Sequence, residues 1–139
     1  MQSVPFGHRF TGMFHSPQIT FYSTDLNRLR DFYLGLGFEQ RFQHPRDGQP
    51  IHVELTLDGF NLGIADVESA RNDHGLSPAL DGRPVELVLW CEDTDGQFDR
   101  LAGAGCSALS EPHDWLDDLR IAWIADPDGN PIQLVQKLG

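Results

Sequence analysis

The chain has 139 residues and a formal net charge of −11, with 40% hydrophobic and 22% charged residues. This length and composition are typical of one globular domain with a real hydrophobic core. The negative charge argues against binding to nucleic-acid phosphates or anionic membrane surfaces, and no apolar run approaches the length of a membrane span. Two cysteines and no signal-peptide pattern predict a reduced, cytoplasmic protein.

The first half of the chain predicts a strand, a helix and three further strands. Residues 18–23 alternate and are rich in β-branched and aromatic types, which indicates a strand. Residues 24–37 place apolar side chains at helical spacing and end on a glycine. Residues 38–44 predict a second strand, and residues 51–65 predict a hairpin around an Asp-Gly turn.

The second half repeats this order after a linker. Residues 67–82 carry no sustained period and predict a linker with at most one helical turn. The elements that follow are a strand (85–91), a helix (92–105), a short strand (107–110), an acidic loop (111–119) and a closing hairpin (120–136).

Corresponding residues recur in the two halves. Asp25 and Asp93 are candidate helix caps, as are the neighbouring threonines, while Gly37 and Gly105 are the matching helix stops. The Asp-Gly turn of each closing hairpin recurs as well. The sequence therefore predicts that the same order of strands and helix occurs twice in the chain.

This repetition predicts an α+β fold of two βαβββ modules, which together form a cupped, mostly antiparallel sheet. The modules span residues 15–66 and 83–139 within one structural domain, and residues 1–14 form an N-terminal extension. A helix covers one face of each module's strands, so the other faces curl toward each other and leave a cup.

Alternation along the strands predicts which side chains enter the cup. In the strand at 120–125, Arg120 and Ala122 are expected in the cup, and Ile121 and Trp123 on the packed face. Polar residues with aromatic walls are typical of a small-molecule cleft, although one face of an antiparallel sheet can also simply be solvated. The candidate ligand-binding residues are Gln18, Tyr22, His52, Glu54, Trp90, Arg120 and Gln133.

Two further side chains, Glu86 and Trp115, are candidates for a functional role. Glu86 is a candidate general base or ligand anchor, or half of a solvated ion pair with Arg120. Trp115, in the acidic loop, is a candidate lid over the ligand or an exposed loop aromatic. Neither Cys91 nor Cys106 has a neighbouring base in the sequence, so a nucleophilic role is not expected.

Two stretches resemble a known family. TDLNRLRDFYLGLGFE and ADPDGNPIQLVQ are similar to the signature stretches of the vicinal oxygen chelate superfamily, also called the glyoxalase, bleomycin-resistance and dioxygenase superfamily. The resemblance covers the chain from about residue 15 onward and implies the paired-module fold. It also implies a homodimer with clefts at or near the interface. It does not choose among the lyases, epimerases, dioxygenases, thiol transferases and drug-sequestering proteins of that superfamily.

The resemblance implies four metal-ligand positions, occupied here by Gln18, Gly63, Glu86 and Gln133. Glycine has no side chain, and Gln133 replaces the usual glutamate. Zn²⁺ and Ni²⁺ favour nitrogen and sulfur ligands, and Fe²⁺ oxygenases favour two histidines and one carboxylate. No cofactor is therefore favoured. If a metal binds, the expected ligands are Gln18, Glu86 and His52.

The expected function is metal-independent binding of an aromatic or cationic metabolite or antibiotic in the cup, as the bleomycin-resistance-like members of the superfamily suggest. An acidic protein favours a cationic ligand. The alternative is a glyoxalase-like lyase or isomerase, or a dioxygenase, with a divalent metal (Zn, Ni, Fe or Mn). A third interpretation is a metal-free enzyme with Glu86 as the base.

Overall fold

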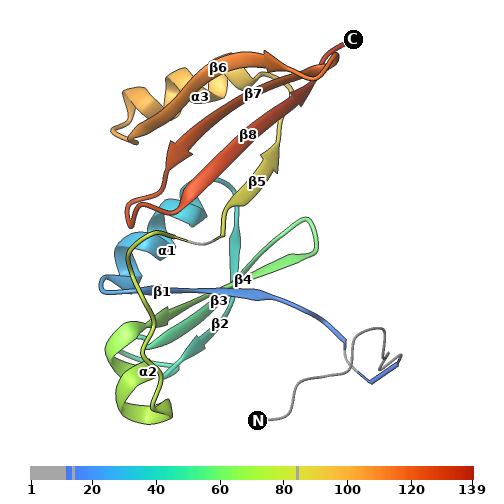
Figure 1. Ribbon diagram of the computed structural model, residues 1–139. Coiled ribbons are helices and arrows are strands. Elements are labelled where there is room, and N and C mark those ends of the chain that lie inside the picture. The colour runs from blue at the N-terminus through green and yellow to red at the C-terminus, as the bar shows by residue number, and fades with distance from the viewer. Residues whose placement is uncertain (1–11, 14, 84) are drawn as a thin grey trace.

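The structure is a computed structural model that describes residues 12, 13, 15–83 and 85–139. Most of the expected extension, residues 1–14, lies outside the described residues. The chain forms two four-stranded sheets (Figure 1). No helix in the described part of the chain is long and apolar enough to cross a membrane.

Each sheet has the same strand order and a helix of its own. The first sheet has the order β1-β4-β3-β2 and the second has the order β5-β8-β7-β6. In each module the first strand, which precedes the helix, pairs in parallel with the last strand. The other strand pairs are antiparallel. The elements of the first module are β1 (Ile19–Ser23), α1 (Leu26–Gly35), β2 (Glu39–His44), β3 (His52–Leu57) and β4 (Phe60–Asp66). Those of the second are β5 (Leu87–Trp90), α3 (Thr94–Gly103), β6 (Ala108–Trp115), β7 (Leu119–Ala125) and β8 (Pro131–Lys137). The α+β fold with two βαβββ modules is confirmed.

The internal repetition is visible in the backbone. Asp25 caps α1 by accepting the backbone N–H of Arg28, and Asp93 caps α3 in the same way. After the helices, Gly37 and Gly105 adopt φ angles of 108° and 107°, a region in which side chains are strained. The predicted caps and stops are therefore the observed ones.

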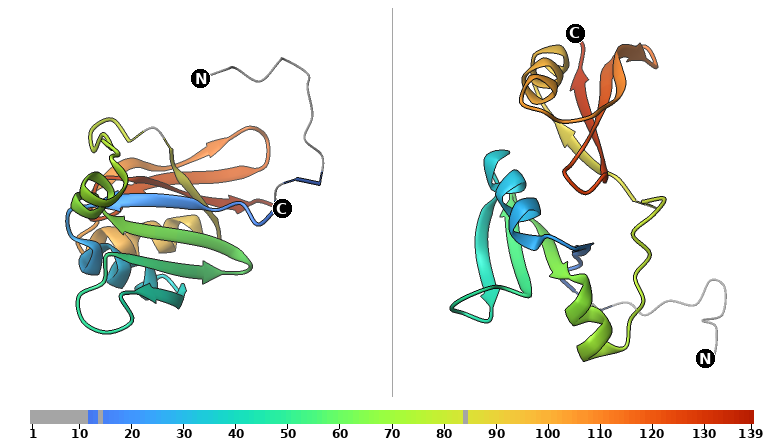
Figure 2. Two further views of the ribbon diagram at one scale, coloured as in Figure 1. Left: turned by 90° about the horizontal axis from the view of Figure 1, so that it is seen from below. Right: turned by 90° about the vertical axis from the view of Figure 1, so that its left-hand side faces the viewer.

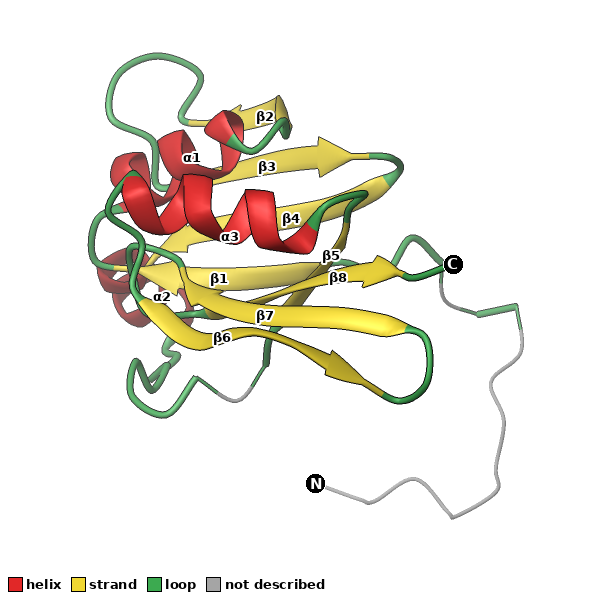
Figure 3. Ribbon diagram, turned by 90° about the horizontal axis from the view of Figure 1, so that it is seen from above, coloured by secondary structure: helices red, strands yellow, loops and turns green. Residues whose placement is uncertain are grey.

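One hydrophobic core joins the two modules. Helix α1 packs on β1, β3 and β4, and α3 packs on β6, β7 and β8; Figure 3 shows both helices in front of the strands. Buried residues from both modules belong to a single cluster. In this core the hydroxyl of Tyr33 on α1 donates to Asp126, just after β7, across 2.8 Å. The helix of the first module is thereby tied to the closing hairpin of the second.

The linker prediction was incomplete. Helix α2 (Val67–His74) follows β4 directly. Asp66 caps it by accepting from the backbone N–H of Ser69, and Gly75 ends it in the left-handed conformation. Residues 75–83 then run along the outside of the molecule toward β5 (Figure 2, right). The polar face of this short helix hid its period from the sequence pattern.

The predicted acidic loop at 111–119 was largely wrong. Strand β6 continues to Trp115 and pairs with β7 through two register shifts. Bulges of this kind break the alternation by which a strand is recognised in a sequence. The remaining turn between β6 and β7 is short.

The expected orientation of β7 was also wrong. Trp123 lies opposite Gln133 of β8, on the face away from α3, while Ala122 lies opposite Leu134 and belongs to the core. Arg120 is on the same side as Ala122. Ile121 and Ala122 are both buried, so the strand has no wet face from which its phase could be deduced.

Candidate functional site

A pocket of about 510 Å³ lies where the first module meets β5. We call it the seam pocket. Its walls come from both modules, so neither module forms it alone. It is lined by Ile19, Phe38, Leu57, Asp58 and Phe60 of the first module and by residues 86–90 of the second.

The seam pocket combines apolar walls with negative charge. Asp58 and Glu86 are the only charged residues among the described residues that line it. Trp90 is 66% exposed and supplies a large aromatic surface. An apolar pocket with a few polar anchors is typical of small-molecule sites, and the two carboxylates here favour a cation.

Glu86 is held in place by an indole. The Nε1–H of Trp123 donates to its Oε2 across 2.6 Å. The ring of His113 on β6 stacks on Trp123 with centroids 6.3 Å apart. A hydrogen bond to an ionised acceptor is shorter and stronger than a neutral one, so the carboxylate has a preferred orientation. Alternation along residues 120–125 places the Trp123 side chain on the opposite face, so the sequence did not predict it at this site.

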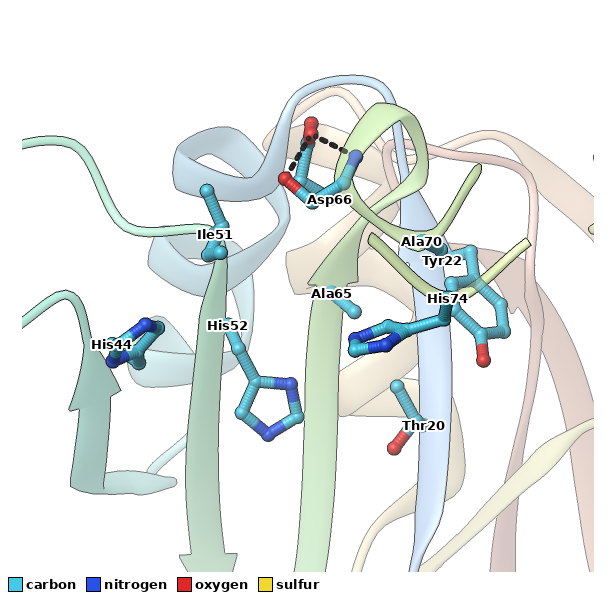
Figure 4. Close-up of a pocket in the computed structure, with 10 residues that line it drawn as sticks. Thr20, Tyr22, His44, Ile51, His52, Ala65, Asp66, Ala70 and His74 are labelled. Atoms are coloured by element: carbon cyan, nitrogen blue, oxygen red, sulfur yellow. Dashed lines mark hydrogen bonds between the residues drawn. The ribbon is translucent and has the colours of Figure 1, made fainter. Parts of the chain in front are cut away.

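A second pocket, of about 280 Å³, lies between the first sheet and α2 (Figure 4). We call it the histidine pocket because three imidazoles line it. It shares no lining residue with the seam pocket. The lining residues are Thr20, Tyr22, His44, Ile51, His52 and Ala65 on the strands and before β3, and Asp66, Ser69, Ala70 and His74 at α2.

His52 belongs to a small polar cluster. Its Nε2 lies 3.2 Å from Oε2 of Glu54, and the side-chain amide of Gln18 donates weakly to the same oxygen across 3.5 Å. An ionised carboxylate only accepts hydrogen bonds, so His52 carries its proton on Nε2 when it is neutral. The sequence predicted these three residues in one cup, and the structure brings them together.

The predicted single cleft is divided between two pockets. Tyr22 and His52 line the histidine pocket, whereas Trp90 and Glu86 line the seam pocket. Gln133 lies between Val88 and Trp123 on the neighbouring strands. Trp115 is 53% exposed near the turn after β6 and lines neither pocket.

The structure corrects the predicted position of Arg120 in the cup. Its guanidinium pairs with Asp95 on α3 across 2.9 Å and with Asp114 on β6 across 3.1 Å. Hydrogen bonds first to Asp95 and then to Asp114 raise its pKa. It therefore lies on the helix side of the second sheet. It does not pair with Glu86, and the expected cationic anchor of the cleft is not there.

Three residues that line these pockets were not predicted as site residues from the sequence. Asp58 was read as part of a turn, and His44 and His74 were assigned to a strand end and a linker. His44 is opposite His52 in the strand register, so the alternation could have placed it. Nothing in the sequence could have placed His74, because its position depends on how α2 folds back against the sheet.

Comparison with known proteins identifies the family. The sequence profile of the Glyoxalase/Bleomycin resistance protein/Dioxygenase superfamily matches residues 15–134. The chain belongs to this superfamily. No curated protein sequence matches it significantly.

Solved structures share the fold of this superfamily member. A hypothetical protein from S. aureus is 20% identical with a TM-score of 0.74, and the match covers 90% of this chain and 95% of that one. TioX from Micromonospora sp. ML1 is 22% identical, with a TM-score of 0.68 and coverage of 89% and 100%. Lactoylglutathione lyase from Agrobacterium tumefaciens is 22% identical, with a TM-score of 0.62 and coverage of 87% and 92%. At these identities the likeness shows the fold alone.

The superfamily's metal chemistry does not fit the residues present. Gly63 has no side chain to offer a metal, and a Cβ at this position would lie 2.6 Å from the hydroxyl oxygen of Thr20, which would have to move. Glu86 is engaged by Trp123, and Gln133 offers only a neutral amide. Within the described residues, no three histidine, cysteine, aspartate or glutamate side chains are arranged to hold a metal ion. We therefore derive no step that passes through a metal.

Proposed function

We propose that the protein binds a cationic aromatic small molecule in the seam pocket without a metal. The observation that carries this proposal is the pairing of Glu86 with Trp90 in one apolar pocket whose charged residues are both acidic. Such a ligand would stack its ring system on Trp90 and direct its positive charge toward Glu86.

The charge balance of the pocket supports a cation over a neutral ligand. Asp58 and Glu86 have no described lysine or arginine beside them in the lining, because Arg120 lies on the other face. The net charge of −11 adds a long-range attraction for cations. A neutral ligand of the same shape would gain the stacking but not the electrostatic contribution.

The proposal is tested by isothermal titration with 9-aminoacridine, a planar cation, and with acridine, its largely neutral counterpart at neutral pH. We expect the cation to bind more tightly. Glu86→Gln should weaken its binding by about tenfold, the effect of about 1.4 kcal/mol. Trp90→Ala should weaken binding of both compounds.

A matched control is available on α3. Asp99→Asn removes the same charge at an exposed position that lines neither pocket. It should leave the affinity within about twofold, because a distant exposed charge is screened. Equal binding of the two compounds, or equal losses in Glu86→Gln and Asp99→Asn, would refute the proposal.

The homodimer stays a prediction. Four apolar side chains on β1 and on residues 85–90 are each more than two-fifths exposed, and this apolar strip supports an interface between two copies: Ile19, Val85, Val88 and Trp90. Light scattering after gel filtration measures the mass directly. Val88→Lys should dissociate a dimer that uses this strip, and a monomeric wild-type protein would rule it out.

A further inference from the structure

A smaller pocket, of about 230 Å³, adjoins the seam pocket at the end of β5. Three residues line both pockets, so the two cavities share a wall: Leu57, Leu89 and Trp90. The rest of the lining comes from the residues after α1 and β5, from α3 and from β8: Leu36, Cys91, Gln97, Arg100, Leu101 and Leu134. We call it the arginine pocket, because Arg100 is the only charged residue among the described residues that line it.

The guanidinium of Arg100 is held by a neighbour on the same helix and not by an acid. Its Nε donates to Oε1 of Gln97 across 3.1 Å, and its Nη2 donates to the same oxygen. Every ion pair between described residues involves another cation, not Arg100. An amide oxygen leaves the positive charge uncompensated. Nη1 of Arg100 and the side-chain N–H groups of Gln97 therefore remain as donors for a ligand.

The two adjoining pockets carry opposite charges. The described lining of the seam pocket holds Asp58 and Glu86 and no cation, and that of the arginine pocket holds Arg100 and no carboxylate. Trp90 lies in their common wall and is largely exposed. Arginine is always protonated in proteins, so this polarity does not depend on the titration of a side chain near neutral pH. A molecule that lies along Trp90 therefore meets negative charge on one side and positive charge on the other.

We propose that the ligand of the seam pocket is a zwitterion, an aromatic cation whose carboxylate reaches into the arginine pocket. The carboxylate would accept hydrogen bonds from Arg100 and Gln97, whose donors suit its two oxygens. The chain that joins it to the ring would lie against Leu57 and Leu89 of the shared wall. This inference rests on the proposed function, because it requires the ring on Trp90 and the positive charge near Glu86.

The test is isothermal titration of the full chain with three compounds that share one ring system. 9-Aminoacridine is the parent cation. The second compound carries a carboxylate on a flexible chain attached to the 9-amino nitrogen, as in N-(acridin-9-yl)aminohexanoate. The third is the primary amide of the second, which has the same length and no negative charge. We expect the carboxylate to bind about fivefold more tightly than the amide, the upper range for an ion pair that is exposed to solvent, and less so at high salt.

Variants assign this preference to Arg100. Arg100→Gln should abolish the difference between the carboxylate and the amide, and Arg100→Lys should keep part of it, because lysine retains the charge but not the planar set of donors. Glu86→Gln should weaken binding of both compounds equally. The matched control is Arg46→Gln, which removes the same charge at an exposed position that lines neither pocket and should keep the full preference. Thermal melting verifies that each variant is folded.

The three compounds separate failure of this inference from failure of the proposed function. If 9-aminoacridine binds but the carboxylate and the amide bind equally, the inference is overturned and the proposed function stands. A preference for the carboxylate that persists in Arg100→Gln, or that Arg46→Gln removes to the same extent, would overturn the assignment to Arg100. If none of the three compounds binds, the proposed function is refuted and this inference with it.

Discussion

The indole N–H of Trp123 on β7 donates to the carboxylate of Glu86 across 2.6 Å. Glu86 immediately precedes β5, so this bond links the edge of the second sheet to its interior across β8. It engages Oε2 of Glu86, so in the proposed complex the other carboxylate oxygen would be the one that faces the cation. Trp123 is therefore a positioning residue for the proposed site.

Replacing Trp123 with Phe keeps an aromatic ring under His113 but removes the donor. We expect affinity for 9-aminoacridine to fall by about fivefold, which corresponds to the roughly 1 kcal/mol that a typical hydrogen bond contributes. Isothermal titration measures it. Trp115→Phe is the matched control, because this exposed indole lines neither pocket, and it should bind as wild type. If Trp115→Phe loses as much affinity, the lid predicted from the sequence would be the better explanation.

Removing Arg120 should not affect ligand binding. Its partners Asp95 and Asp114 lie on the side of α3, so Arg120→Ala is expected to bind 9-aminoacridine with wild-type affinity. The melting temperature should fall slightly, and less so at high salt, because these ion pairs are exposed to solvent. A loss of affinity comparable with that of Glu86→Gln would contradict the observed placement of Arg120.

A side chain at position 63 should be poorly tolerated. Gly63→Ala places a Cβ against the Thr20 hydroxyl, and overpacking of this kind costs about 1–3 kcal/mol. Denaturant unfolding measures the cost. Removing the hydroxyl with Thr20→Ala in the same chain should recover most of the lost stability. Additive effects of the two substitutions would show that this contact is not what excludes a side chain from position 63.

Tyr33 should limit stability at high pH. Burial, and then the nearby charge of Asp126, raise its pKa well above the ordinary value. A raised pKa in the folded state means that this contribution is complete below the unfolded value of about 10 and is lost as the pH rises beyond it. The free energy of unfolding should therefore decline above about pH 10.

The variant Tyr33→Phe separates the two effects of this residue. It removes the hydrogen bond to buried Asp126, so the unfolding free energy near neutral pH should fall by about 1–3 kcal/mol. The part of the alkaline decline caused by this phenol should disappear. Identical pH profiles in the variant and the wild type would show that Tyr33 does not cause the loss of stability at alkaline pH.

The sequence predicted the features that depend on local chemistry. Asp25 and Asp93 cap their helices, and the two Asp-Gly turns close matching hairpins, because capping and tight turns need particular residues at particular positions. Strands with one wet face, such as β3, had the correct orientation: Val53 and Leu55 are buried, and His52 and Glu54 are not.

The failures concern features set by tertiary structure. Strand β7 is apolar on both faces, so its sequence does not show which face is buried. Arg120 and Trp123 were therefore predicted on the wrong faces of the sheet. The division of the cup into two pockets depends on how α2 closes one end and how β5 meets the first module. Neither arrangement leaves a signal in the spacing of residues. Without such a signal, His74 and Asp58 could not be assigned to sites from the sequence.

The central claim is that a cation binds to Glu86 and Trp90 without a metal. The most direct measurement is titration of 9-aminoacridine into protein that has been treated exhaustively with a chelator, alongside metal analysis of the untreated protein. We predict the same affinity before and after chelation, and in both cases an affinity about tenfold weaker in Glu86→Gln. Binding that disappears on chelation and returns with Zn²⁺, Ni²⁺, Fe²⁺ or Mn²⁺ would contradict this account.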